Sequence, residues 1–176
     1  MKIHTIPAIL FSLIPLTSLT PLMADEINVA YEYMQKPQVD FSKATKGPLK
    51  VAMFSDARQV SDPKAISDDT VEQPVSEIVR NALAQAFVAG GATLVEDGQS
   101  LTLEGEITEV AVAEKDGAYE VTIRTHVTLK RGSQTAFDTV IFGRASGELL
   151  DQAVRATLDR LVNSLILDDY FLMEVL

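Results

Sequence analysis

The sequence predicts an α+β fold, in which a mainly antiparallel sheet of about five strands carries two helices packed on one face. Two observations predict this fold class. Long stretches alternate apolar and polar residues, as strands do, and two other stretches repeat apolar residues every three or four positions, as helices do. The expected order is strand, helix, strand, a three-strand meander and a final helix. We expect residues 49–176 to form a single domain.

The first strand is expected at residues 49–55, with Leu49, Val51 and Met53 on one side of it. The other side is apolar too, at Phe54 for example, which indicates a strand covered on both faces. The polar stretch 56–73 then predicts a long acidic loop. Long ordered loops of this kind are often functional.

The first helix is expected to begin at Pro74, where the missing backbone N–H has no cost. Apolar residues recur at helical spacing as far as Phe87, and Gly90-Gly91 is typical of a helix end. A glycine pair that ends a helix does not predict a phosphate-binding loop, since such a loop precedes a helix. Residues 92–95 predict a short strand.

The meander starts at Leu101, and its alternation slips by one residue after Glu109, which indicates a β-bulge. Asp116-Gly117 predicts a tight hairpin turn into a second strand. The third strand is expected at residues 135–142, followed by a loop at residues 143–147. One face of the meander is apolar and the other polar.

The last helix is expected at residues 148–167, where leucines recur every three or four positions. The apolar tail from Tyr170 to Leu176 has two interpretations. It either packs beneath the sheet as additional core or forms an exposed patch for a partner, and core is favoured because large exposed apolar patches are uncommon.

The amino terminus predicts export. Residues 1–24 run from a basic start through a proline-broken apolar stretch to a small residue, the pattern of a cleaved secretory signal peptide. Cleavage near Ala24/Asp25 would leave a periplasmic protein with no integral membrane span. Residues 25–48 form either an edge strand or a lead-in segment without regular structure.

The composition excludes several classes of function. The formal net charge of −10 disfavours binding to nucleic acid or to anionic lipid. The sequence has no cysteine, which excludes thiolate zinc sites and the lipobox cysteine of an anchored lipoprotein, so we expect a protein that is not lipid-anchored. No catalytic motif, metal site or cofactor site is predicted.

The sequence from Val51 to Arg58 (VAMFSDAR), Pro74 to Glu77 (PVSE), Gly90-Gly91 and Leu165 to Asp168 (LILD) resembles the YajG-type family of bacterial envelope lipoproteins. The resemblance covers residues 49–169. It implies a small α+β domain in the bacterial envelope, although the lipid-bearing cysteine of the family is missing.

Asp56 and Arg58 follow the end of a strand predicted to be buried, a place where α/β proteins often carry functional residues. These two residues either pair with each other or leave Arg58 to bind a carboxylate or phosphate. A salt bridge at the surface is the favoured interpretation.

Asp62, Asp68, Asp69 and Glu72 add further acidic groups in the same loop. Their spacing does not match a calcium-binding EF-hand, so a solvated loop is favoured over a calcium site. His126 lies alone on the polar face of its strand and has no predicted partner for general base catalysis.

These observations predict an exported envelope accessory protein, not an enzyme, that acts by binding an envelope protein partner. The predicted contact residues are Asp56, Arg58, Asp62, Asp68 and Asp69, together with the exposed sheet edge. The alternative is a periplasmic carrier that holds a small apolar or anionic ligand between the sheet and the helices.

Overall fold

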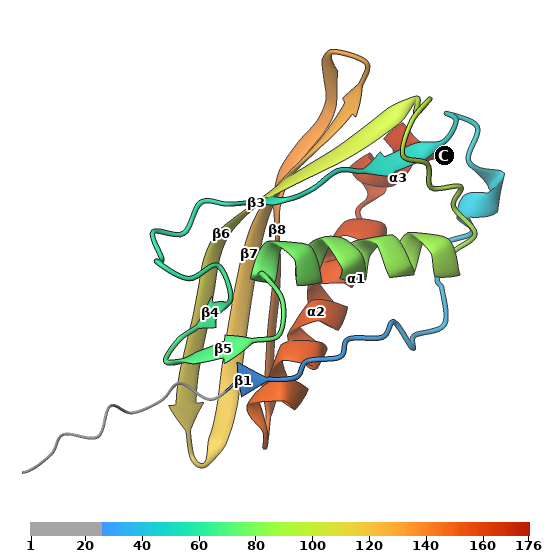
Figure 1. The fold of residues 1–176 in the computed structure, drawn as a ribbon. Helices are drawn as coiled ribbons and strands as arrows, with labels where there is room; N and C mark the ends of the chain where they lie inside the picture. Colours follow the sequence, from blue (N-terminus) through green and yellow to red (C-terminus); the bar gives the residue numbers. More distant parts are fainter. Residues whose placement is uncertain (1–25) are drawn as a thin grey trace, which may run out of the picture.

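The computed structural model describes residues 26–176 and has the predicted α+β architecture. Helices α1 (Val75–Ala89) and α2 (Leu150–Ile166) cover one face of a five-stranded sheet, and three short strands form a second sheet (Figure 1). The predicted signal peptide at residues 1–24 lies outside the described residues. No helix within residues 26–176 combines the length and apolar character that a membrane crossing requires.

Three long antiparallel strands form most of the five-stranded sheet: β6 (Leu101–Lys115), β7 (Ala118–Arg131) and β8 (Gln134–Gly147). The register between β6 and β7 shifts between Ile107 and Glu109, so the β-bulge lies within one residue of its predicted position. Asp116 and Gly117 both have positive φ, 54° and 76°, as a tight hairpin turn requires.

Strand β8 is longer than the sequence predicts, because residues 143–147 continue it instead of forming a loop. Gly143 and Ala145 pair with Ile123 and Val121 of β7, so the ladder continues through residues that have little strand propensity of their own. Tertiary pairing and the contact with α2 therefore decide the conformation of this segment.

The edge of the sheet next to β6 consists of two short parallel strands, β2 (Leu49–Val51) and β3 (Ser55–Asp56). The interval from Val51 to Ser55 is one residue longer than the facing interval on β6, so the edge strand carries an extra residue. This extra residue corrects the prediction for Met53, which is 71% exposed, while Phe54 turns inward and is only 6% exposed.

The stretch 92–95, expected as a strand, contributes only a single bridge between Leu94 and Leu49.

The extra residue between β2 and β3 also explains why Phe54 is buried, because it turns the Phe54 ring inward, directly over Gly105 of β6. A Cβ at Gly105 would be 2.3 Å from that ring.

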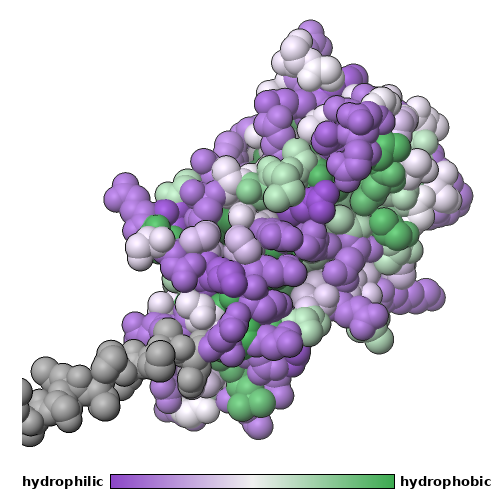
Figure 2. Space-filling view, viewed as in Figure 1, coloured by the Kyte–Doolittle hydropathy of each residue, from purple (hydrophilic) through white to green (hydrophobic). Residues whose placement is uncertain are grey.

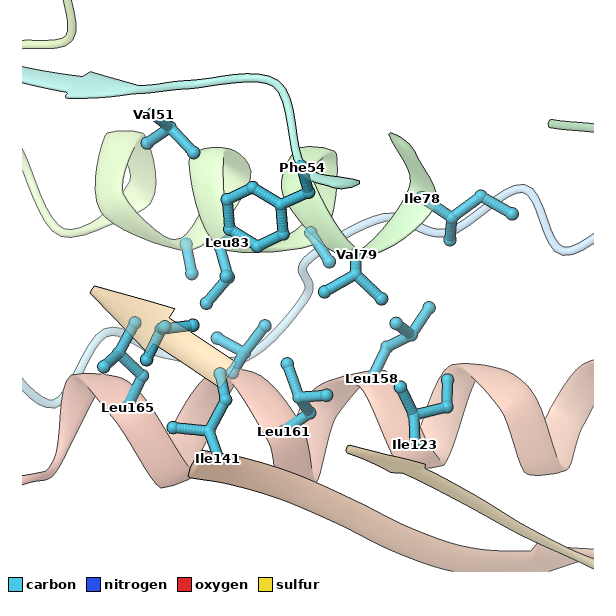
Figure 3. Packing of buried hydrophobic residues seen from close by; sticks show 14 of the residues in the cluster. Val51, Phe54, Ile78, Val79, Leu83, Ile123, Ile141, Leu158, Leu161 and Leu165 are labelled. Atoms are coloured by element: carbon cyan, nitrogen blue, oxygen red, sulfur yellow. The ribbon is translucent and has the colours of Figure 1, made fainter. Parts of the chain in front are cut away.

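The hydrophobic core lies between the sheet and the two helices (Figure 3). Leu83 of α1 and Leu161 of α2 approach each other above Ile141 of β8, and all three are almost fully buried. The helix-covered side of the molecule is mainly hydrophilic on its outer surface (Figure 2), because each helix turns its apolar stripe toward the sheet.

Helix α2 rests directly on the backbone of β8. A Cβ at Gly143 would lie 2.0 Å from the carbonyl oxygen of Thr157 and 2.9 Å from the backbone nitrogen of Leu161. Glycine at this position removes the side chain that would hold the helix away from the strand. The distance between α2 and the sheet therefore depends on this residue.

The amino-terminal residues begin with β1 (Glu26–Ile27), which pairs in parallel with β5 (Asp69–Val71) in the three-stranded sheet. The chain then continues as an extended segment, residues 28–35, which we call the N-terminal strap. Figure 1 shows it passing α2 and then running alongside α1. Of the two structures predicted for residues 25–48, this segment is not an edge strand of the large sheet, although Val29 is buried and Tyr31 and Tyr33 are half-buried.

The apolar tail forms a third helix, α3 (Asp169–Val175), whose first backbone N–H groups donate to the Asp168 carboxylate. Phe171 is fully buried and its ring centroid is 5.6 Å from that of Phe137. Tyr170 and Met173 on the opposite side are exposed. Because the tail is a helix, one side of it packs into the core and the other side faces solvent. Each of the two predicted interpretations therefore holds for one side of the tail.

Replacing Gly143 by alanine should lower the free energy of unfolding by about 3 kcal/mol, because the added methyl group must displace α2. Denaturant unfolding of the purified protein measures the change. Ser146→Ala on the same strand is the matched control and should change stability by less than about 0.5 kcal/mol, since Ser146 is exposed. Equal stability of the two variants would contradict the close contact.

Candidate functional site

Asp56 and Arg58 form a bidentate ion pair at the end of β3. The Arg58 side chain donates from Nε to Asp56 Oδ1 at 2.9 Å and from Nη2 to Asp56 Oδ2 at 2.6 Å. The same guanidinium donates to the carbonyl oxygens of Ala65 and Pro63 at 2.8 and 3.2 Å. The Arg58 and Asp56 side chains are only 7% and 13% exposed. Arg58 therefore joins the end of β3 to the loop and to β4 (Ala65–Ile66).

The pKa of Asp56 lies below its ordinary value of 3.8. Partial burial raises this pKa, but the hydrogen bonds from the Arg58 side chain and backbone N–H, with the positive charge of Arg58, lower it further than burial raises it. Asp56 is thus ionised at neutral pH, and its oxygens already accept the donors of Arg58.

The remaining predicted contact residues are spread along the loop. The Asp62 carboxylate accepts the backbone N–H of Lys64, Asp68 is exposed, and Asp69 begins strand β5 opposite Ile66. The structure brings Asp56 and Arg58 together but does not gather the other three around them. Within residues 26–176, no three acidic or histidine residues are placed to hold one metal ion.

Glu72, at the end of this loop, binds the N-terminal strap. Its carboxylate accepts the backbone N–H groups of Val29 at 2.9 Å and of Ala30 at 3.2 Å. Further along the strap, the Tyr31 hydroxyl donates to Asp159 of α2 at 2.8 Å, and the Tyr33 N–H donates to Gln85 of α1 at 2.9 Å. The pKa of Tyr31 is raised by burial and by its interaction with the Asp159 carboxylate. The strap thus links the loop with both helices.

The second face of the β6–β7–β8 sheet, which we call the uncovered face, has no helix across it in the described part of the chain. Charged side chains pair across neighbouring strands on this face, at a favourable spacing for antiparallel strands. The pairs are Lys130 with Glu104, Arg124 with Glu109, Arg144 with Glu120, and His126 with Asp138.

His126 does have a partner, which the sequence did not predict. Its Nε2 lies 3.0 Å from Asp138 Oδ1, and the Thr128 hydroxyl donates to the other oxygen of the same carboxylate at 2.8 Å. These hydrogen bonds, with the one from His126 as the largest cause, lower the pKa of Asp138. The three groups form an exposed polar cluster on the surface of β7 and β8.

Two apolar residues interrupt the polar character of the uncovered face. Val140 and Phe142 of β8 are 52% and 51% exposed, and the Arg124 guanidinium carbon lies 5.4 Å from the centroid of the Phe142 ring. A hollow of about 320 Å³ on the same face is lined by Ala111, Thr122 and Phe142 among others. An exposed aromatic residue with arginine beside it and polar groups around it is typical of a protein-binding surface.

A second hollow, of about 510 Å³, lies where the uncovered face meets α2 along the outer edge of β8. Phe142, Arg144 and Ser146 of β8 line it together with Arg160 and Ser164 of α2. It is an open surface feature that leaves this edge of the sheet accessible.

The alternation of apolar and polar residues predicted a polar face for the meander, but two residues of the third strand depart from it. Residues 135–142 place Val140 and Phe142 on the side where β7 carries only polar residues. Two apolar residues at solvent-facing positions of one strand are the feature from which the surface was predictable.

The comparisons with known proteins give a family. The family model described as "LptE: Lipopolysaccharide-assembly" matches residues 58–167. This supports the expectation of an envelope lipoprotein family at that general level, while the narrower YajG-type resemblance is not specifically supported. No curated protein matches the sequence.

Several solved structures are similar to this chain. The crystal structure of protein XCC0632 from Xanthomonas campestris is 15% identical, with a TM-score of 0.55 over 81% of this chain and 89% of that chain. The hypothetical protein CT253 from Chlamydia trachomatis is 8% identical, with a TM-score of 0.48 over 73% and 92% of the two chains. A minor lipoprotein from Acinetobacter baumannii is 10% identical, with a TM-score of 0.45 over 70% and 91%. At this identity, the likeness to XCC0632 shows the fold alone.

Replacing Asp56 by asparagine should lower the free energy of unfolding by about 2 kcal/mol at neutral pH, because the shielded Arg58 loses its counter-charge. Since the folded-state pKa of Asp56 is depressed, its contribution is present above the unfolded-state pKa and disappears as the pH falls through the folded-state pKa. The wild type and D56N should therefore converge in stability under acid conditions.

Denaturant unfolding measured across this pH range tests the expectation. Asp68→Asn is the control, because Asp68 is exposed in the same loop and its replacement should have little effect at any pH. A constant difference between wild type and D56N at all pH values would contradict the role given to the ion pair.

Proposed function

This chain belongs to the lipopolysaccharide-assembly family LptE, and we propose that it is a non-enzymatic accessory protein of outer-membrane assembly that binds an envelope protein partner. The proposal refines the predicted role of an envelope accessory protein by naming the process in which it acts. It assigns the protein a docking role and no chemical step.

The observation that carries the proposal is the uncovered face of the sheet. This face combines paired charges with the exposed side chains of Val140 and Phe142, so it offers both specificity and apolar contact area. A large sheet surface of this kind is suited to contact with another folded protein. We propose that the partner lies against this face around Thr122 of β7, which pairs with Ala111 of β6 and Arg144 of β8.

The alternative role as a carrier has less support. The helix–sheet interface is filled by a continuous cluster of buried hydrophobic side chains (Figure 3). The donors of Arg58, which an anionic ligand would need, are directed to Asp56 and to two backbone carbonyl oxygens. We therefore favour protein binding. Asp62, Asp68 and Asp69 remain candidates for a secondary contact through the acidic loop.

We propose further that the protein works in the periplasm after removal of residues 1–24. The sequence has no cysteine to carry a lipid, so attachment to the outer membrane would depend on the protein partner. This arrangement makes the docking surface responsible for location as well as for function.

A photo-cross-linking amino acid placed at Thr122 should capture an outer-membrane protein of lipopolysaccharide assembly in cells. The same probe at Val88, an exposed position of α1 on the helix-covered side, is the control and should not capture it. The captured protein is identified by mass spectrometry. Capture from a probe at Asp68 but not from Thr122 would place the contact on the acidic loop and contradict the proposed surface.

Intact-mass measurement of the protein isolated from the bacterial envelope should give the mass of residues 25–176 without any added lipid. The reason is that a signal peptidase cut after Ala24 leaves Asp25 first and no cysteine for lipid attachment. Retention of Met1 would contradict export by this route, and a mass increase equal to acyl chains would contradict the unanchored state.

A further inference from the structure

The outer strand of the five-stranded sheet, β8, has one side without a backbone partner in the described chain. The strand order is β2-β6-β7-β8, so β8 pairs with β7 only. Within residues 26–176, no backbone hydrogen bond joins Gln134–Gly147 to an element on the other side. A free edge of this length is a template for pairing with another strand.

Strand β8 has only part of the usual protection of a free edge, the charged side chains of Asp138 and Arg144. Its sequence, QTAFDTVIFGRASG, contains neither proline nor lysine, and its central residues are β-branched or aromatic. The open hollow between β8 and α2, lined by Arg144 and Arg160, leaves room along this edge. The strand is therefore both suited to pairing and accessible.

We infer that this edge pairs with the β8 edge of a second copy of the chain, antiparallel around a two-fold axis at Ile141. In this register, Asp138 of each copy faces Arg144 of the other, and Val140 of each copy faces Phe142 of the other. All four residues lie on the uncovered face, because they alternate along β8. The strand is thus complementary to itself, as a two-fold interface requires.

Other registers lose this complementarity. An axis one residue earlier, at Val140, places Asp138 opposite Phe142. An axis one residue later, at Phe142, places Val140 opposite Arg144. Both put a charge against an apolar side chain. An axis between two residues is excluded, because facing residues would then point to opposite sides of the sheet.

The pairing is compatible with the ion pairs already present on the uncovered face. The Asp138 carboxylate contacts His126 and accepts the Thr128 hydroxyl, and Arg144 pairs with Glu120, all through side chains at the surface. Arg144, Arg160 and Glu120 line the same hollow, so the incoming Asp138 meets two positive charges and one negative charge there. On the inner side, Ile141 at the axis is 1% exposed, and Gly143 and Ala145 are small and buried under α2, so no long inner side chain extends past the edge.

The result is one continuous sheet across two copies, with both uncovered faces on the same side. The pairing adds strand-to-strand hydrogen bonds at the outer edge of β8 and leaves the part of each uncovered face formed by β6 and β7 open. This inference does not depend on the proposed function, and either can fail without the other.

Charge exchange tests the register. Asp138→Arg alone, and Arg144→Asp alone, place like charges opposite each other twice in every dimer, so each should weaken dimerisation by about tenfold or more in Kd. The double variant D138R/R144D restores opposite charges across the axis and should regain most of the affinity. Sedimentation velocity over a range of concentrations measures Kd for the full processed protein purified from the envelope.

Lys130→Glu is the matched control, since Lys130 is a charged residue of the same face on β7 that does not lie at the edge. It should leave dimerisation unchanged. A wild-type protein that stays monomeric at every concentration would overturn the inference. Loss of dimerisation in the double variant as well as in both single variants would overturn the proposed register.

Engineered cysteines test the same axis without relying on affinity. The chain has no cysteine of its own, so Val140→Cys and Phe142→Cys would introduce the only thiols. A mixture of the two variants should form a disulfide-linked dimer on oxidation, because Val140 faces Phe142 of the other copy. Each variant alone should cross-link poorly, since the cysteines of its two copies would lie diagonally across the paired strands, too far apart for a disulfide. Preferential cross-linking of V140C with itself would contradict an axis at Ile141.

Discussion

The structure depends on the burial of one face of the β6–β7–β8 sheet beneath two helices. The contact is closest at Gly143, where the missing side chain lets α2 rest on the backbone of β8. The apolar stripes of both helices are directed into this layer, which excludes water and supplies the main stabilising force. As a consequence, the opposite face of the sheet and the outer edge of β8 are left as surfaces.

Polar contacts hold the segments that the core alone would not fix. Arg58 binds Asp56 and two carbonyl oxygens of the loop, while Glu72 binds the backbone of the N-terminal strap. Tyr31 then reaches Asp159 of α2. These groups are partly shielded from solvent, where an unsatisfied polar group would be costly. Their hydrogen bonds therefore fix the positions of the loop and of the N-terminal strap. The acidic loop is therefore mainly structural near Asp56 and more exposed around Asp68.

The family and the geometry support the same kind of role. Membership in a lipopolysaccharide-assembly family indicates a process, and the uncovered face is the surface through which we propose that this chain takes part in it. The two surfaces have different chemistry. The two surfaces share Val140 and Phe142 of β8, but the face offers these side chains together with paired charges, whereas the edge of β8 offers unpaired backbone groups and a self-complementary side-chain order. One surface suits a different protein and the other suits a second copy.

The sequence by itself determined the α+β class, the bulge near Glu109, the hairpin at Asp116-Gly117 and most of both helices, because these follow from local periodicity and turn chemistry. Only the tertiary structure decided the inward turn of Phe54, the extension of β8 through Gly143, the backbone carbonyl partners of Arg58 and the partner of His126. The register of the edge strand against β6, and the approach of α2 to β8, join residues far apart in the chain. No local pattern encodes those distances, since they arise when separate elements pack together.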